Sequence, residues 1–241
     1  EGDRMRSFIV MAMFLASFAS SAASDYTETR DLAIDAAGLG ILFIDAGAGN
    51  IDVEGVHGID RVEVKATIVI PDTDADDALK IMEKKLELSL ESHDSQAVLK
   101  SRFENSFWGS GSNRHIDLEI RAPATLAISI DDGSGSMDVR NFVSDVRIDD
   151  GSGSIDVHTV GSLDIDDGSG SIDVTNVAGN VYVDDGSGTI TIDEVGGSVT
   201  VDDGSGSIRV TDVAEDLIIL DGGSGSISFS NVRGTVEQDD D

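Results

Sequence analysis

The sequence predicts an all-β protein built around a parallel β-solenoid (β-helix) of about six 18-residue coils, behind an N-terminal β-rich capping head with one short helix. The first observation is a repeated turn motif, Asp-Asp-Gly-Ser-Gly-Ser and close variants, which returns at steps of 18, 17, 18, 18 and 19 residues. A fixed period with constant turn chemistry is typical of stacked structural repeats. The copies begin at Asp131, Asp149, Asp166, Asp184, Asp202 and Asp221.

The second observation is the alternation of apolar and polar residues after each turn. Period-2 alternation predicts short strands with one buried face, and Ile and Val suit such strands. Stacked copies about 4.8 Å apart would pair each strand with its counterparts in the neighbouring coils. The clearest column, which we expect to line the inside of the tube, is Met137, Ile155, Ile172, Ile190, Ile208 and Ile227.

The turns of each coil contain residues suited to corners. Glycines such as Gly151 and Gly153 permit backbone geometry that a Cβ would resist. The second Asp of each pair is expected to cap its own turn, and turn amides that favour its charged form are expected to offset part of the repulsion along this row. The first Asp is expected to lie on a solvated face. The opposite corner has one polar column, Asn141, Thr159, Asn176, Glu194, Asp212 and Asn231.

The composition is strongly acidic. The chain has 241 residues, with 47 acidic against 16 basic residues and a formal net charge of −31. Residues 131–241 contain 25 acidic and 4 basic residues, a net of −21. Such a surface repels phosphate groups, so we expect no nucleic acid and no anionic membrane as partners. There is no cysteine, which excludes disulfides and thiolate metal sites.

The N-terminal 23 residues are expected to be a signal peptide with preceding non-native residues. Met5 and Arg6 begin a short positive region, and an apolar run follows from Phe8 to Ala19. Small residues at 21–23 suit cleavage after about Ala23. The run is too short to span a bilayer as a helix. We therefore expect a mature, exported chain that begins near Ser24.

Residues 24–125 are expected to form the head, and residues 126–241 the solenoid repeats. Strands are predicted at 32–34, 41–44, 62–70, 86–91, 96–103 and 115–121. A diverged copy of the repeat turn begins at Asp45, so the solenoid pattern starts within the predicted head. Asp74 is a predicted cap for a helix over about 74–85, whose apolar stripe would include Leu79 and Met82. Residues 104–114 are a predicted loop with Phe107 and Trp108.

No residues stand out as catalytic, cofactor-binding or metal-binding, and we expect none of these sites and no cofactor. The Gly-x-Gly turns are followed by strands, whereas a dinucleotide loop needs a following helix. No Gly-x-Ser-x-Gly motif of the serine hydrolases occurs. The four histidines, His57, His93, His115 and His158, show no clustered spacing, so we expect them to be structural or surface residues.

Two alternatives remain open. Some polysaccharide-active enzymes are parallel β-helices, but the expected outward residues vary from coil to coil and include a single aromatic residue. The Asp pairs could make a calcium- or cation-binding solenoid, because toxin calcium rolls also use 18 residues per turn. Here, however, Asp156 follows Gly153 by three residues instead of two, and only one half of each coil has the turn. Weak binding of divalent cations stays open.

The expected leader, the head that ends at residues 116–130, and the Gly-Ser-Gly-Ser-Ile-Asp-Val coils together resemble a bacterial adhesin family of β-strand-repeat domains, a domain of unknown function. The resemblance covers nearly all of 30–238. It implies a parallel β-helical fold on periplasmic, cell-surface or extracellular proteins, and it supplies no catalytic residues. This sequence differs in its acidic turns. We therefore expect an exported, non-enzymatic envelope or surface protein, adhesin-like, that serves in binding or structural spacing with an unknown surface or envelope partner.

Overall fold

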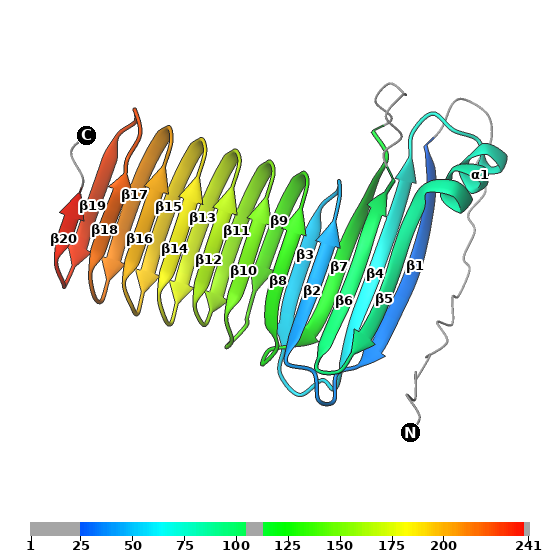
Figure 1. Cartoon of the computed structure of the whole chain (residues 1–241), viewed down its shortest axis with the longest axis horizontal. Helices are drawn as coiled ribbons and strands as arrows, with labels where there is room; N and C mark the ends of the chain where they lie inside the picture. The colour runs from blue at the N-terminus through cyan, green and yellow to red at the C-terminus, as the bar shows by residue number, and fades with distance from the viewer. Residues whose placement is uncertain (1–24, 105–112, 239–241) are drawn as a thin grey trace.

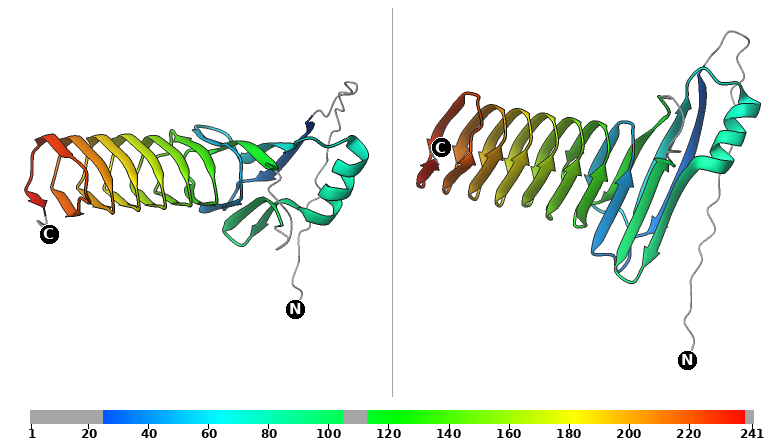
Figure 2. Two further views of the ribbon diagram at one scale, coloured as in Figure 1. Left: turned by 90° about the horizontal axis from the view of Figure 1, so that it is seen from above. Right: turned by 45° about the horizontal axis from the view of Figure 1, so that its top comes forward.

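The computed structural model describes residues 25–104 and 113–238. The described residues form an elongated rod of two facing ten-stranded sheets, with a wider head at its N-terminal end (Figures 1 and 2). The predicted leader and the Phe107–Trp108 loop lie outside the described residues. The predicted all-β solenoid with a β-rich head and one helix is confirmed.

The first sheet, sheet A, runs without interruption from the head to the far end of the rod. Its three outermost head strands pair in antiparallel fashion, and the strands of the solenoid are parallel. The spatial order is β1 (Tyr26–Asp35), β4 (Arg61–Ile70), β7 (His115–Pro123), β3 (Ile51–Val56), β9 (Gly135–Arg140), β11 (Gly153–Val160), β13 (Gly170–Val177), β15 (Gly188–Val195), β17 (Gly206–Val213) and β19 (Ile227–Val232).

The second sheet, sheet B, faces the first and is built in the same way. Only its outermost head pair, β5 and β6, is antiparallel among the described strands of this sheet. The spatial order is β20 (Val236–Gln238), β18 (Leu217–Asp221), β16 (Val199–Asp203), β14 (Val181–Asp185), β12 (Leu163–Asp167), β10 (Val146–Asp150), β8 (Ala127–Asp132), β2 (Ile41–Ala46), β6 (Gln96–Phe103) and β5 (Leu86–His93).

The coils stack in the register that the repeat predicts. Ile172 pairs with Ile155 on one side and Ile190 on the other, and all three side chains are fully buried. Each inner column is therefore a continuous apolar ladder between the two sheets. The core extends without a break from the head through the repeats, because the same two sheets enclose both regions.

The diverged turn at Asp45 belongs to the stack of coils. Asp45 pairs in parallel with Asp131, and Ile51 pairs with Met137. After this first coil the chain leaves to form β4, α1, β5, β6 and β7, and returns at β8. The head strands therefore extend the two solenoid sheets, which explains how the head covers one end of the tube.

The helix α1 (Ala75–Lys85) lies beside the outer strands of the head (Figure 1). The Asp74 side chain accepts a hydrogen bond from the Asp77 amide, as expected of a cap. Ala78 and Met82 are buried, but Leu79 is 50% exposed, so the prediction that Leu79 belongs to the buried stripe is wrong. Ala78 and Met82 belong to the core, and the partly buried Ile81 packs against it.

The polar corner column adopts left-handed backbone geometry in every copy. The φ angles lie between 53° and 66°. Asn and Asp tolerate this region better than other side chains, which explains their preference here. Neighbouring coils also bond to each other, since the Asn176 side chain donates to the Thr159 hydroxyl at 2.9 Å. The column is Asn141, Thr159, Asn176, Glu194, Asp212 and Asn231.

Candidate functional site

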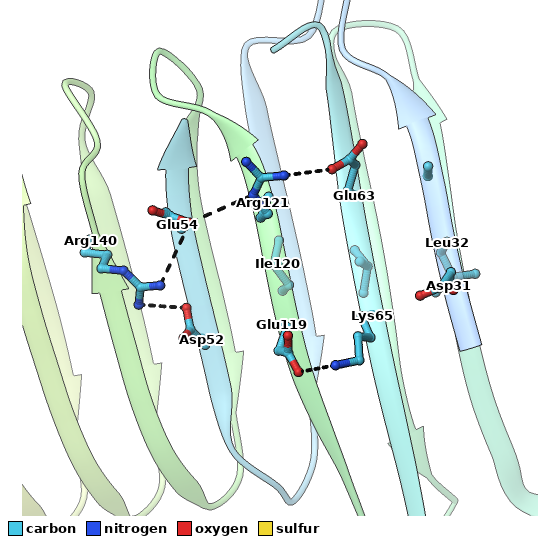
Figure 3. Close-up of a pocket in the computed structure, with 12 residues that line it drawn as sticks. Asp31, Leu32, Asp52, Glu54, Glu63, Lys65, Glu119, Ile120, Arg121 and Arg140 are labelled. Atoms are coloured by element: carbon cyan, nitrogen blue, oxygen red, sulfur yellow. Dashed lines mark hydrogen bonds and ion pairs between the residues drawn. The ribbon is translucent and has the colours of Figure 1, made fainter. Parts of the chain in front are cut away.

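The outer face of sheet A is hollowed over the head, in an open groove of about 620 Å³ that we call the head groove (Figure 3). It crosses β1, β4, β7, β3 and β9. Five acidic and three basic side chains line it, and their charged ends point outward because they alternate along each strand with buried residues such as Val64 and Ile120. The charged residues are Asp31, Asp52, Glu54, Glu63, Lys65, Glu119, Arg121 and Arg140.

Opposite charges alternate across the strands of the head groove. The Lys65 ammonium lies 2.6 Å from a Glu119 carboxylate oxygen. Arg121 lies between Glu63 and Glu54, at 3.3 and 3.9 Å (Figure 3). Such cross-strand pairs stabilise a sheet register by about 0.2–1 kcal/mol each. Together they favour the order in which β4, β7 and β3 pair.

Arg140 forms the border between the head groove and the repeats. Its guanidinium is 2.8 Å from Asp138 on its own strand and 2.8 Å from Asp52 on β3. The hydrogen bond that Arg140 donates to Asp138, together with the contact with Asp52, raises the pKa of Arg140. The three cations that line the head groove are therefore already paired with acids. The groove offers paired charges to a ligand instead of free positive charge.

The outer face of sheet B has a second open groove of about 630 Å³, the sheet B groove, which crosses β2, β8, β10, β12, β14 and β16. Tyr182 is 39% exposed there and Phe43 is half-buried. Between them, Arg147 donates to an Asp164 oxygen at 2.5 Å. An exposed Tyr and Arg on a rigid sheet are the residue types enriched where proteins bind partners.

A third feature lies at the corner that leads from sheet B into the Gly-Ser turns, where the Asp pairs form two rows. The first residues of the pairs, the outer Asp row, stack on the outside, in register up to Asp202 and with a register shift before the pairing with Asp221. The second residues, the inner Asp row, are at most 5% exposed. The outer Asp row is Asp131, Asp149, Asp166, Asp184, Asp202 and Asp221, and the inner Asp row is Asp132, Asp150, Asp167, Asp185 and Asp203.

The inner Asp residues cap their own turns, as the sequence predicts. One oxygen of Asp167 accepts a hydrogen bond from the Ser169 amide at 3.1 Å, and Asp185 accepts one from Ser187 at 3.0 Å. Asp150 and Asp203 do the same with the Ser two residues on. The second oxygen of every inner Asp is buried and has no hydrogen-bond partner among the described residues.

Hydrogen bonds from the turn amides favour the charged form of the inner Asp row, as expected, but burial has the larger effect on the pKa values of these carboxyl groups. Burial raises the pKa of Asp132 to about 7, and the pKa values of Asp167 and Asp185 to about 6. The pKa values of Asp150 and Asp203 are raised for the same reason. Hydrogen bonds from the turn amides lower these pKa values by less than burial raises them. The sequence signal for this burial was the apolar column two residues before each inner Asp.

The structure does not bring the four histidines together. His57, His93 and His158 are exposed, and His115 is half-buried with Nε2 3.8 Å from Asp117. Within residues 25–104 and 113–238, no group of three or more His, Cys, Asp or Glu side chains has a geometry that could hold a metal ion. No helix in the same ranges is long and apolar enough to cross a membrane.

Comparison with known proteins supports the fold. No family model matches the sequence, and no curated protein matches it. A putative adhesin from Bacteroides fragilis NCTC 9343 aligns over 89% of this chain and 97% of its own, with 18% identity and a TM-score of 0.52. The β-helical fold that the family resemblance implies is therefore confirmed.

Two other solved structures align over similar lengths but at lower scores. A putative cell adhesion protein from Clostridium sporogenes ATCC 15579 covers 89% of this chain and 100% of its own, at 10% identity and a TM-score of 0.37. A putative adhesin from Parabacteroides distasonis ATCC 8503 covers 89% and 97%, at 11% identity and a TM-score of 0.39. Scores below 0.5 add nothing to the argument for a shared fold.

Proposed function

We propose that this chain is an exported, non-enzymatic envelope or surface protein that acts as an adhesin-like binding or spacing rod. The main support is the contrast between the constant inner columns and an outer row of sheet B that changes from coil to coil. One outer row of sheet B runs Ser129, Arg147, Asp164, Tyr182, Thr200 and Ile218. A rigid scaffold with a variable outer face suits recognition of a partner. The name of the Bacteroides fragilis protein is consistent with this role.

The sheet B groove is the proposed contact surface. Tyr182 provides an exposed ring with a hydroxyl, and the Arg147–Asp164 pair next to it provides donors and acceptors fixed by their ion pair. Such side chains can stack on and hydrogen-bond a polar ligand such as an oligosaccharide. The net charge of −31 disfavours nucleic acid and anionic membranes as partners. The ligand class we propose is therefore a neutral or cationic surface glycan.

A glycan array with the fluorescently labelled chain, followed by binding to intact bacterial cells, tests this function. We expect saturable binding that Tyr182→Ala weakens by about tenfold or more, the usual effect of losing a buried aromatic contact. Arg209→Ala, on the outer face of sheet A, is the matched control and should leave binding unchanged. Equal binding by the Tyr182→Ala variant would exclude the groove. Release of reducing sugar from a bound polysaccharide would instead support the enzyme alternative.

Export is tested separately by mass spectrometry of the mature protein from its native cells. The proposal expects an N-terminus near Ser24 and recovery in the envelope or culture fluid. A mature protein that retains residues 5–23 would contradict export by this leader. This experiment is independent of the glycan array, so a failure of export and a failure of glycan binding can be told apart.

A further inference from the structure

The inner Asp row places buried carboxyl groups in a line along the rod. Successive members are register partners on adjacent strands, from Asp132 on β8 to Asp203 on β16. Adjacent strands lie about 4.8 Å apart, so the three middle carboxyl groups have another one coil away on either side, and Asp132 and Asp203 have one such neighbour each. Exposure falls from 5% at Asp132 to 0% at Asp203. Five acids therefore share one dry corner of the solenoid.

The charged groups that act on this row are all acids. Within the row, Asp150 acts on Asp132 and Asp167, and Asp203 acts on Asp185. From outside, the outer Asp row acts on it, including Asp221 on Asp203. The strand after each turn begins with Gly, then Ser or Thr, then an apolar residue, as in Gly170, Ser171 and Ile172, and this segment has no ionisable group. No Lys or Arg side chain in the described residues forms an ion pair with the inner Asp row.

Each inner carboxyl has only half of its hydrogen-bonding capacity satisfied. One oxygen accepts from a turn amide, and the other is buried without a partner. A buried carboxylate without a counter-charge is strongly unfavourable, and in practice such a group becomes neutral. A metal ion could supply the charge, but the described residues hold no group of three ligands that could bind one. A proton can bind to the one carboxyl oxygen that has no hydrogen-bond partner, and it needs no other ligand.

We propose that the inner Asp row is a proton-binding element, whose carboxyl groups keep their protons close to neutral pH and make the solenoid more stable in mild acid than in mild base. The element would act as a pH-sensitive device of the rod. It is independent of the proposed glycan contact, which lies on the outer face of sheet B.

The direction of the effect follows from proton linkage. Burial raises the pKa of Asp132 to about 7 and of Asp167 and Asp185 to about 6, whereas an Asp in an unfolded chain has a pKa of about 4. The folded chain then binds more protons than the unfolded chain between about pH 4 and pH 7. The stabilisation is complete below about pH 4 and is lost as the pH rises through 6 to 7. Carboxylates in ion pairs have the opposite effect.

Carbon-detected NMR of the Asp carboxyl groups in the whole chain, from pH 4 to pH 8, is the primary experiment. We expect a set of Asp resonances with midpoints near pH 6 to 7. Assignment uses Asp167→Asn, which should remove one of them, and Asp166→Asn, which removes an outer carboxyl of the same charge and should leave the set intact. If every Asp titrates below about pH 5, the proposal is wrong.

Urea unfolding of the same three proteins supplies the functional readout. The parent should unfold at a higher urea concentration at pH 5 than at pH 8. Asp167→Asn should bind about one proton fewer on folding near pH 5, while Asp166→Asn should match the parent. Equal effects of the two substitutions would overturn the proposal. A shift of the NMR midpoints by KCl or CaCl2, but not by choline chloride at equal ionic strength, would show cations in place of protons and overturn it as well. If Asp167→Asn does not fold, the titration of the parent decides.

Discussion

The head and the solenoid share two continuous sheets, yet they place their charges in opposite ways. In the head groove, Lys65 faces Glu119 and Arg121 faces Glu63, so acids alternate with bases across the strands. In the repeats, Asp156 stacks on Asp138 and Asp173 on Asp156. The proximity of Asp173 and Asp138 adds to burial in raising the pKa of Asp156. Both patterns lie on the outer face of sheet A.

The difference in charge placement follows from the sequences of the two regions. Copies of one repeat, stacked in parallel and in register, place each residue type beside itself, which suits Ile, Val, Gly and Asn but not Asp. Strands of the head have unrelated sequences, so each can carry the charge that complements its neighbour. The repeats therefore combine an optimal apolar core with unfavourable acidic rows, and four predictions test that contrast.

The largest expected effect concerns the turn glycines. A Cβ on Gly170 would overlap the backbone carbonyl of Gly153 in the neighbouring coil, and backbone cannot move aside as the end of a flexible side chain could. Gly170→Ala should therefore destabilise the solenoid by at least about 4 kcal/mol. Gly58, in the head, also has a positive φ of 82°, but a Cβ there meets nothing within 4 Å. Gly58→Ala should cost only about 1–2 kcal/mol, from backbone strain alone.

Urea unfolding of both alanine variants measures this difference. The difference between the two losses of stability depends on the stacking distance between coils. Both glycines have a positive φ, but only Gly170 lies against the backbone of a neighbouring coil. Similar losses of stability for the two variants would show that the coils stack less closely than described.

The second effect compares substitutions at neighbouring inward-facing and outward-facing positions of one strand. Ile172 is fully buried between Ile155 and Ile190, so Ile172→Asp would place a carboxyl where no turn amide can bond it. We expect a loss of about 3 kcal/mol or more. Asp173→Ser, one residue on and facing outward, should change the stability by no more than about 0.5 kcal/mol. The melting temperatures of the two variants measure this difference. Equal losses would contradict the assignment of Ile172 to an inner column.

Much of this architecture is predictable from the sequence, because a repeat reports its own register. The columns, the polar corner and the turn caps follow from aligning the six copies. The head is harder to predict, since β1, β4, β7 and β3 pair in an order unlike their order in the chain. The predicted strand at 32–34 is in fact the ten-residue β1, because it pairs with β4 along its whole length. Nothing in the segment alone indicates that partner.

The candidate sites show the same division. Alternating charges at 63 and 65 and at 119 and 121 are visible in the sequence, but only the pairing of β4 with β7 makes them a groove. The inner Asp row was identified as a set of turn caps, but the rise of its pKa values through burial was not predicted. Whether burial outweighs one or two amide hydrogen bonds depends on how tightly the next coil covers the carboxyl, which a sequence does not report.

The third prediction concerns salt and the outer Asp row. Its members repel by about 0.9 kcal/mol per neighbouring pair in water at one coil spacing. Raising the salt from 0.1 to 1 M shortens the Debye length from about 10 to about 3 Å, so we expect a gain in stability of about 2 kcal/mol for the row. Thermal melts in NaCl, MgCl2 and CaCl2 at matched ionic strength should coincide. A rise specific to calcium at millimolar concentration would favour the cation-binding alternative.

The smallest effect is expected in the head, and it should have the opposite sign in salt. The Lys65–Glu119 pair is close, at 2.6 Å, but both side chains are about half exposed or more. A double-mutant cycle of Lys65→Met and Glu119→Gln should give a coupling energy of about 0.2–1 kcal/mol at low salt. Screening should reduce this coupling towards zero at 1 M NaCl, the same condition that stabilises the outer Asp row. The two regions would then respond to one variable in opposite directions, as alternating and stacked charges must. A coupling that persists at 1 M NaCl would mean that Lys65 and Glu119 interact through packing or a hydrogen bond shielded from solvent, and the contrast would then be one of burial instead of charge order.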